Sequence, residues 1–183
     1  MSHGMQQIII SGLGGQGVLF VTRLLADAAL ETGLSVLISE THGMAQRGGN
    51  VISHLKVAPR DSDRPLVSPL IRPGRADILL ALHPEAISVH GHYLSPKGIA
   101  FANSAEDLPG ARTLDATLLA AALASPVSAN MALLGFAAAS GKLFCGPDRI
   151  EAALRGYGGK RLDVSLRAFR AGCDAAADAP GPR

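Results

Sequence analysis

The stretch Gln7–Val18 reads QIIISGLGGQGV, and it decides the fold. Its β-branched run, Ile8–Ser11, is too short for a helix and ends at a glycine, which predicts a buried strand. Beyond the glycines, apolar residues recur at helical spacing as far as Ala29, and Gly33 is placed to end a helix. The run Leu34–Ser39 predicts a second strand. Strand, helix and strand in this order predict a βαβ unit, with a right-handed crossover joining a parallel pair of strands.

The rest of the chain continues as an α/β protein and then becomes helical. Asn50–Val57 alternates between two faces, which predicts a strand with one face in solvent. From Asp115 onward the sequence is rich in alanine and leucine and predicts helices only. We therefore expect a three-layer α/β/α fold with a mostly parallel or mixed central sheet and a helix-rich C-terminal part. Further expected elements are a loop over 58–74 with a short strand at 66–68, strands at 76–81, 98–102 and 112–114, a final helix at 160–177 and a flexible tail at 178–183.

Composition sets the class of protein. The 183 residues, 48% of them hydrophobic, suffice for a single domain over 1–183 with a substantial core, and a formal net charge of +2 argues against a nucleic-acid partner. No apolar run approaches the ~18 residues of a membrane span and no secretory signal is evident, so we expect no membrane partner and a cytoplasmic location. Two distant cysteines, Cys145 and Cys173, exclude a self-contained iron–sulfur or zinc site. Only 4% of the residues are aromatic, so small residues on the late helices either pack the core or form a helical subunit interface.

The segment Gly12–Gly17, GLGGQG, joins the first strand to the first helix. Glycines here can adopt positive φ, which we expect at Gly14, and they let a ligand approach the backbone. The N–H groups and dipole at the helix start suit a phosphate. The segment also matches GxGxxG, and Glu40 ends the next strand where a ribose-binding acid would stand, so an NAD(P)-binding domain is one hypothesis. A crowded turn without a ligand is the structural alternative.

A second glycine-rich stretch, Ser39–Asn50, follows the second strand. It has no helical period, and it carries the donors His42, Gln46 and Arg47 beside its glycines. Because both stretches follow the carboxyl ends of neighbouring strands, we expect them to open at the same edge of the sheet. Arg47 is the strongest candidate, since a guanidinium suits phosphate or carboxylate and each charged hydrogen bond contributes ~1.5–3 kcal/mol. A long hairpin connection with solvated side chains is the alternative.

Together these stretches resemble the indolepyruvate:ferredoxin oxidoreductase beta subunit, the small-subunit form of the gamma-type domain of 2-oxoacid:ferredoxin oxidoreductases. HGMAQRGG after GGQGV is the specific part of the match, and it favours the aryl-pyruvate branch of the family. The likeness covers nearly the whole chain. The matching stretches are GLGGQGV at 12–18, SETHGMAQRGG at 39–49, VISH at 51–54, SPLI at 68–71, ADILLA at 76–81, NMALLG at 130–135 and AFRAG at 168–172.

The resemblance implies oxidative decarboxylation of a 2-oxoacid to an acyl-coenzyme A on thiamine diphosphate, with electrons passing through iron–sulfur clusters to ferredoxin. This chain lacks the cluster cysteines and the Gly-Asp-Gly…Asn pattern for magnesium and thiamine diphosphate, so both are expected in a larger alpha subunit. The chain itself would be a non-redox subunit without catalytic residues, inactive alone, that frames the entrance for coenzyme A or substrate. The cofactor-binding residues expected on this basis are Gly12, Gly14, Gly15, Gln16, Gly17, His42, Gln46, Arg47, Gly48, Gly49 and Ser53.

Other hypotheses stay open beside this one. The enzyme alternative is an NAD(P)-dependent dehydrogenase domain, and the non-enzymatic alternative is a free-standing module that binds coenzyme A or phosphate. A homodimer is a further alternative for the assembly. Single side chains have plainer interpretations: His54 is expected to be a structural histidine, and the two cysteines are expected to be small buried hydrophobic residues.

Overall fold

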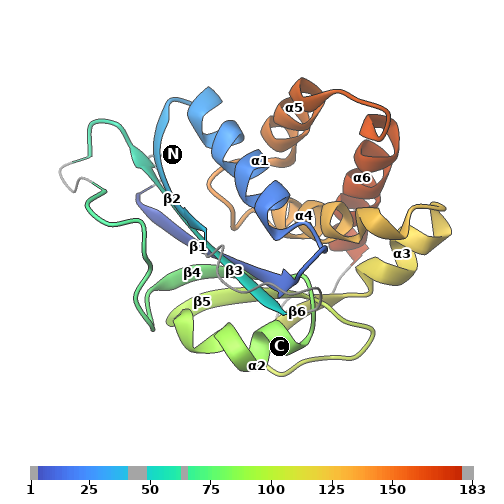
Figure 1. The fold of residues 1–183 in the computed structure, drawn as a ribbon, viewed down its shortest axis with the longest axis horizontal. Helices are drawn as coiled ribbons and strands as arrows, with labels where there is room; N and C mark the ends of the chain where they lie inside the picture. Colours follow the sequence, from blue (N-terminus) through green and yellow to red (C-terminus); the bar gives the residue numbers. More distant parts are fainter. Residues whose placement is uncertain (1–3, 41–48, 63–65, 179–183) are drawn as a thin grey trace.

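The computed structural model describes residues 4–40, 49–62 and 66–178, in which helices flank a six-stranded mixed sheet (Figure 1). The strand order is β2-β3-β1-β4-β5-β6; β1, β4, β5 and β6 are parallel, and β3 is antiparallel to both its neighbours. The strands are β1 (Gln6–Leu13), β2 (Leu34–Glu40), β3 (Asn50–Pro59), β4 (Ala76–Ala81), β5 (Leu94–Asn103) and β6 (Ala111–Leu114). The helices are α1 (Val18–Glu31), α2 (Glu85–His90), α3 (Ala116–Ala122), α4 (Ala129–Ala139), α5 (Pro147–Tyr157) and α6 (Leu162–Asp178), with short 3-10 turns η1 (Gly91–Tyr93) and η2 (Pro126–Ser128).

The α/β class and the helical C-terminal part are as the sequence predicts, but the first strand pairing is different. β3 lies between β1 and β2, so these two strands are not an adjacent parallel pair. β3 meets β1 at Leu13↔Asn50 and β2 at Glu40↔Ser53, antiparallel in both cases. The prediction was wrong because the strand that follows β2 can turn back as its antiparallel partner and fill the place beside β1.

Both faces of β3 are covered, whereas the alternating sequence predicts one face in solvent. Leu55 lies in the core beneath α1, and His54 on the opposite face is only 3% exposed. This second face is covered by α2 and by the segment Leu66–Gly74, which we call the strap and which contains no strand at 66–68. The prediction was wrong because alternation reports the polarity of side chains and not the segments that later cover them.

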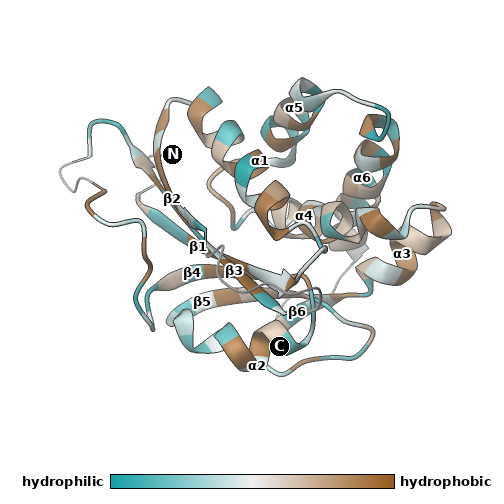
Figure 2. Ribbon diagram, in the orientation of Figure 1, coloured by the Kyte–Doolittle hydropathy of each residue, from teal (hydrophilic) through white to brown (hydrophobic). Residues whose placement is uncertain are grey.

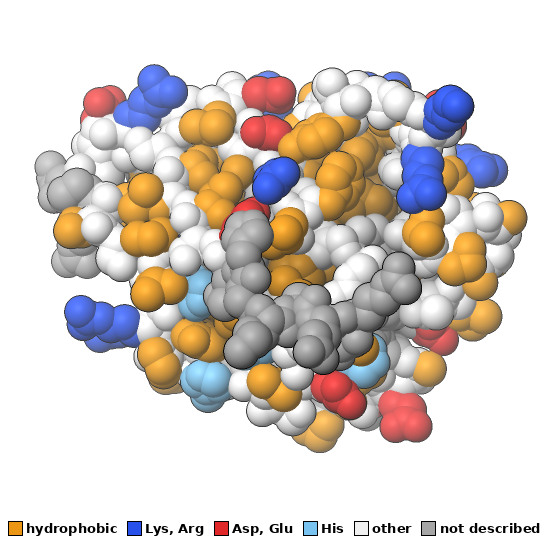
Figure 3. All heavy atoms as spheres, viewed as in Figure 1, with side chains coloured by type: hydrophobic (Ala, Val, Ile, Leu, Met, Phe, Trp, Pro, Cys, Tyr) orange, Lys and Arg blue, Asp and Glu red, His pale blue; other side chains and the backbone are white. Residues whose placement is uncertain are grey.

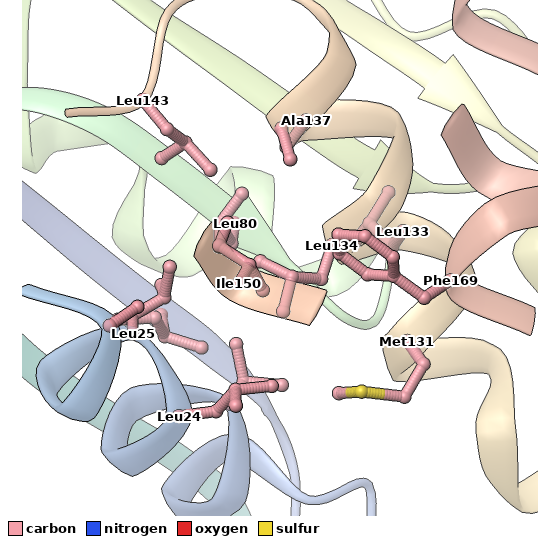
Figure 4. Packing of buried hydrophobic residues seen from close by; sticks show 14 of the residues in the cluster. Leu24, Leu25, Leu80, Met131, Leu133, Leu134, Ala137, Leu143, Ile150 and Phe169 are labelled. Atoms are coloured by element: carbon pink, nitrogen blue, oxygen red, sulfur yellow. The ribbon is translucent and has the colours of Figure 1, made fainter. Parts of the chain in front are cut away.

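Two hydrophobic cores fill the space on either side of the sheet. In the larger one, Leu24 of α1, Met131 of α4, Ile150 of α5 and Phe169 of α6 converge on Leu80 of β4 (Figure 4). Figure 2 shows that α4 and the central strands are mainly hydrophobic. The third layer is thin by comparison. Its core, beneath the strap and α2, consists of Ile9, Ile71, Ala76, Leu79, Ala81, Ala86, Ala100 and Ala102.

Helices α4 and α6 pack against each other through small residues. A Cβ on Gly135 would overlap the carbonyl oxygen of Phe169, and a Cβ on Gly172 would overlap the carbonyl oxygen of Ala132. The backbones of α4 and α6 are therefore in direct contact. The dispersion contacts between them add to the packing of a core that has few large aromatic side chains. Of the two interpretations of the small residues on the late helices, core packing within the chain is confirmed at this contact.

Replacing Gly172 with alanine tests this contact. The added methyl group must push α6 away from α4, so we expect Gly172→Ala to lower the free energy of unfolding by about 2 kcal/mol, as other overpacked cores do. Denaturant unfolding measures the change. Gly156→Ala in α5 is the matched control, because no atom lies within 4 Å of its added Cβ and alanine favours a helix. Equal stability of the two variants would contradict the close contact.

Three backbone N–H groups, in the strap and directly after it, donate hydrogen bonds to β3 and η1. The amide of Ile71, whose side chain is 2% exposed, donates a hydrogen bond to Nδ1 of His54 at 3.2 Å. Gly74 N–H donates to the carbonyl of His92, and the next residue, Arg75, donates in the same way to Tyr93. The Tyr93 ring also stands edge-on to the His54 ring, with centroids 5.3 Å apart. The expected structural role of His54 is confirmed.

His54 should make the stability of the protein depend on pH. Burial, then the nearby charges of His90 and Lys56, lower the pKa of His54 below its ordinary 6.5. In the folded protein its unprotonated Nδ1 accepts the hydrogen bond from Ile71 N–H. The unfolded chain therefore takes up the proton first, and stability falls as the pH drops below about 6.5. The amide oxygen of His54→Asn can replace Nδ1 as the acceptor but does not titrate. We therefore expect the melting temperature of this variant to fall less steeply than that of the wild type as the pH is lowered. Identical slopes in the two proteins would contradict this role.

Candidate functional site

The loop from Gly12 to Gly17 holds a tight turn. Gln16 closes it, since its side-chain oxygen accepts from Leu13 N–H at 2.7 Å while its own N–H donates to the Leu13 carbonyl at 3.1 Å. The positive φ angles are 95° at Gly15 and 82° at Gly17. The expectation of positive φ at Gly14 was wrong, because the left-handed step falls at the start of α1, where Gly17 is the N-cap.

At two positions of this loop, Gly12 and Gly17, there is no space for a side chain. A Cβ on Gly12 would lie 2.9 Å from the Cβ of Leu82, at the end of β4. A Cβ on Gly17 would overlap the side-chain amide of Asn130, and that amide donates to the Gln16 carbonyl at 3.1 Å. The beginning of α4 therefore holds the glycine loop in place. Sequence reasoning missed Asn130 as a site residue, although it begins the stretch NMALLG at 130–135.

The two glycine-rich stretches meet in the fold. Gly14 N–H donates to the carbonyl of Gly49 at 2.9 Å, just beyond the Leu13↔Asn50 pair of β1 and β3. The expectation that both stretches open at one edge of the sheet is therefore confirmed at this point. The edge formed by the glycine loop and Gly49 is called the rim below. His42, Gln46, Arg47 and Gly48 lie outside the described residues, and their binding roles stay predictions.

Ser53 is placed differently from the rim residues. It is fully buried on β3, in the row that includes Leu55, and its Oγ has no hydrogen-bond partner among the described residues. The resemblance suggested Ser53, and its expected contact with a cofactor stays a prediction. In the described structure its hydroxyl is not at the surface, because β3 is an interior strand.

The geometry that an NAD(P) site would need is absent from the described residues. In a dinucleotide fold the acid that binds the ribose ends the strand next to the glycine loop. Here Glu40 ends β2, which is separated from β1 by β3, and Arg23 of α1 lies 3.6 Å from its carboxylate. Two strand spacings of ~4.8 Å separate β2 from β1. The GxGxxG pattern therefore does not indicate a dinucleotide site in this fold.

A cavity of about 420 Å³ opens beside the rim, within the range of small-molecule sites. It lies between α1, α4 and the helices α5 and α6, where hydrophobic side chains gather on the face shown in Figure 3. A second cavity, of about 230 Å³, shares Gln16 and Asn130 with the first as lining residues. The first is lined by Gly15, Gln16, Gly17, Phe20, Val127, Ser128, Asn130, Met131, Leu154, Tyr157, Gly158, Arg161, Leu162 and Ser165.

The electrostatics of the larger cavity favour an anion. Arg161 is its only charged residue among those described, and the helix α1 begins at the cavity without a side-chain cap on its N–H groups. Tyr157 stays neutral, since burial and then its hydrogen bond to Asp27 raise its pKa to about 12. Its ring packs edge-on to Phe20, with centroids 5.3 Å apart. The residues that line this cavity come from distant parts of the chain, so no local sequence pattern could have identified them as one site.

The cysteines have a structural environment. Burial raises the pKa of Cys145 to about 12 and that of Cys173 to about 11, and the Cys173 thiol donates to the Gly135 carbonyl. Both pack against the larger core. Among the described residues, no three His, Cys, Asp or Glu side chains come together as a metal site would require. Within the same residues, no helix has the length and apolar character needed to cross a membrane.

Comparison with known proteins identifies the family. A profile of pyruvate ferredoxin/flavodoxin oxidoreductases matches residues 7–175. The chain belongs to this family. Indolepyruvate oxidoreductase subunit IorB of Thermococcus kodakarensis is 28% identical over 201 residues, a match that covers 95% of this chain and 97% of that protein. Subunit IorB of Archaeoglobus fulgidus is 36% identical over 102 residues, where the match covers 56% of this chain and about half, 48%, of that protein.

Solved structures share the fold. The gamma subunit of a keto/oxoacid ferredoxin oxidoreductase from Geobacter sulfurreducens has a TM-score of 0.75 at 24% identity, covering 95% of this chain and 99% of that one. A 2-oxoglutarate:ferredoxin oxidoreductase from Magnetococcus marinus, with 2-oxoglutarate, coenzyme A and succinyl-CoA bound, has a TM-score of 0.76 at 20% identity, covering 97% of this chain and 32% of that one. The resemblance seen in the sequence is confirmed, and the chain is an IorB homologue with a gamma-type domain of the 2-oxoacid:ferredoxin oxidoreductase family.

The contact between Gly17 and Asn130 can be tested by a double-mutant cycle. Gly17→Ala should destabilise the protein by more than Gly15→Ala, because both introduce a side chain at positive φ but only Gly17 faces the Asn130 amide. Removing that amide in Gly17→Ala with Asn130→Ala should recover about 1 kcal/mol relative to the sum of the single changes. Denaturant unfolding measures all four proteins. Additive effects would show that Asn130 does not hold the loop.

Proposed function

We propose that this chain is the non-redox subunit of an indolepyruvate:ferredoxin oxidoreductase, in which it helps to bind coenzyme A or the 2-oxoacid. Aryl-pyruvate is proposed as the substrate class, because the relatives that match along nearly the whole chain are named for indolepyruvate. The partner is a larger alpha subunit that carries out the oxidative decarboxylation to acyl-coenzyme A and passes electrons on to ferredoxin.

The redox groups belong to that partner in this proposal. Family members work with thiamine diphosphate and iron–sulfur clusters, but the described residues do not fit either group. An iron–sulfur cluster needs about four thiolates, while Cys145 and Cys173 are half-buried thiols with raised pKa values. Magnesium, which would accompany the diphosphate, needs converging carboxylates that the described residues do not supply.

One observation carries the proposed binding role: the hydrogen bond from Gly14 N–H to the Gly49 carbonyl. It brings the glycine loop and the end of the second stretch to one rim, beside the cavity of about 420 Å³. The uncapped N–H groups of α1 and the nearby Arg161 favour phosphate groups such as those of coenzyme A. Phe20 and other apolar walls exclude water and thereby strengthen these polar contacts.

Arg47, in the second stretch, is the residue proposed to make the charged contact. We expect Arg47→Ala to raise the KM for coenzyme A or indolepyruvate about 10- to 100-fold in the enzyme reconstituted with its alpha subunit, since a charged hydrogen bond contributes ~1.5–3 kcal/mol. The melting temperature of the chain should hardly change. Ferredoxin reduction at varied coenzyme A and indolepyruvate measures the effect, and Arg167→Ala, on an exposed position of α6, is the control.

Separate outcomes distinguish the parts of the proposal. Unchanged kinetics in Arg47→Ala would show that the assignment of the site is wrong. Oxidation of indolepyruvate by the chain alone would contradict a non-redox subunit. If the chain formed no complex with an alpha subunit, yet coenzyme A raised its melting temperature, a free-standing coenzyme A module would be the correct function instead.

A further inference from the structure

The strap exposes hydrophobic side chains just before the part of its backbone that is hydrogen-bonded to the rest of the fold, at Ile71 and Gly74. Val67 is 87% exposed and Leu70 is 54% exposed, the former being the largest exposure of any large hydrophobic residue in the described chain. Their neighbour Ile71 is buried, and its amide is bonded to His54. The strap is the segment at the left of Figure 1, between the end of β3 and β4, and hydrophobic and basic side chains adjoin on that side of Figure 3.

Positive charge accompanies these side chains. Arg72 follows directly in the strap and is exposed, and it lies near enough to Lys56 of β3 to lower the pKa of that lysine, although burial is the larger cause. No carboxylate among the described residues forms an ion pair with Arg72 or Lys56. Two neighbouring cations without a described acid partner repel each other, and an external carboxylate would relieve this repulsion.

We propose that the strap is a docking surface for the larger subunit of the oxidoreductase, which receives Val67 and Leu70 in an apolar socket and places carboxylates beside Arg72 and Lys56. This inference rests on the proposed function, because it assumes that such a subunit exists. The strap would be a contact region separate from the rim, on the face of the sheet that α2 covers. The hydrogen bonds at Ile71 and Gly74 fix the backbone next to Leu70 and so reduce the entropy that would be lost there on docking.

The test measures binding of the purified full chain to its purified alpha subunit by titration calorimetry. We expect the double change Val67→Asp with Leu70→Asp to weaken binding about tenfold or more, because two apolar contacts become buried charges. Arg72→Glu should also weaken binding, and it should reduce the dependence of the affinity on salt. Leu30→Asp is the control, since Leu30 is an exposed leucine of similar exposure, 49%, on α1.

The outcomes separate this inference from the proposed function. If the double variant Val67→Asp with Leu70→Asp, called the strap variant, bound the alpha subunit with wild-type affinity and had an unchanged melting temperature, the proposal of a docking surface would be wrong. The proposed role as a subunit would be unaffected. Equal weakening by Leu30→Asp would overturn it as well, because the effect would not be specific to the strap. If wild-type chains form dimers in sedimentation and only these dimers are lost in the strap variant, the occupant is a second copy of this chain. Failure of the wild-type chain to bind any alpha subunit would overturn both.

Discussion

The antiparallel pairing of β3 with β1 on one side and β2 on the other is the constraint on which the rest of the structure depends. It places Gly49, the first described residue after the gap at 41–48, beside the end of β1, where Gly14 N–H bonds to its carbonyl. It also turns His54 toward the strap and Leu55 toward the larger core. One interior strand therefore positions the rim and the strap together, because alternate side chains of a strand point to opposite faces.

The rim and the helical part are joined by packing rather than by chain connectivity. Asn130 reaches the glycine loop from α4, and α4 is held in turn by the backbone contact with α6 at Gly172. Such close contacts transmit small displacements, because a tightly packed interior has little room to absorb them. A change at the α4–α6 contact should therefore reach the rim, although it is distant in sequence from Gly12–Gly17.

The proposed division of labour with a larger subunit is consistent with what these side chains can do chemically. The described residues offer backbone donors, one cavity cation and apolar walls, all of which suit binding and orientation. They do not gather thiolates or carboxylates around a common point. In the proposed function, the chain contributes to catalysis by holding a substrate or coenzyme against a partner that performs the electron transfer.

The sequence by itself determined the local elements and the family. The strand at Ile8–Ser11 and the helix after the glycines form where the pattern predicts, because backbone preference and apolar spacing are local properties. Tertiary structure alone decided that β3 separates β1 from β2, that Asn130 and Tyr157 meet at one cavity, and that Gly135 faces a backbone carbonyl. These features depend on which distant segments pair and pack. Because the backbone hydrogen-bonding groups of a strand are the same whatever its sequence, a strand's partner is chosen only when the whole chain folds.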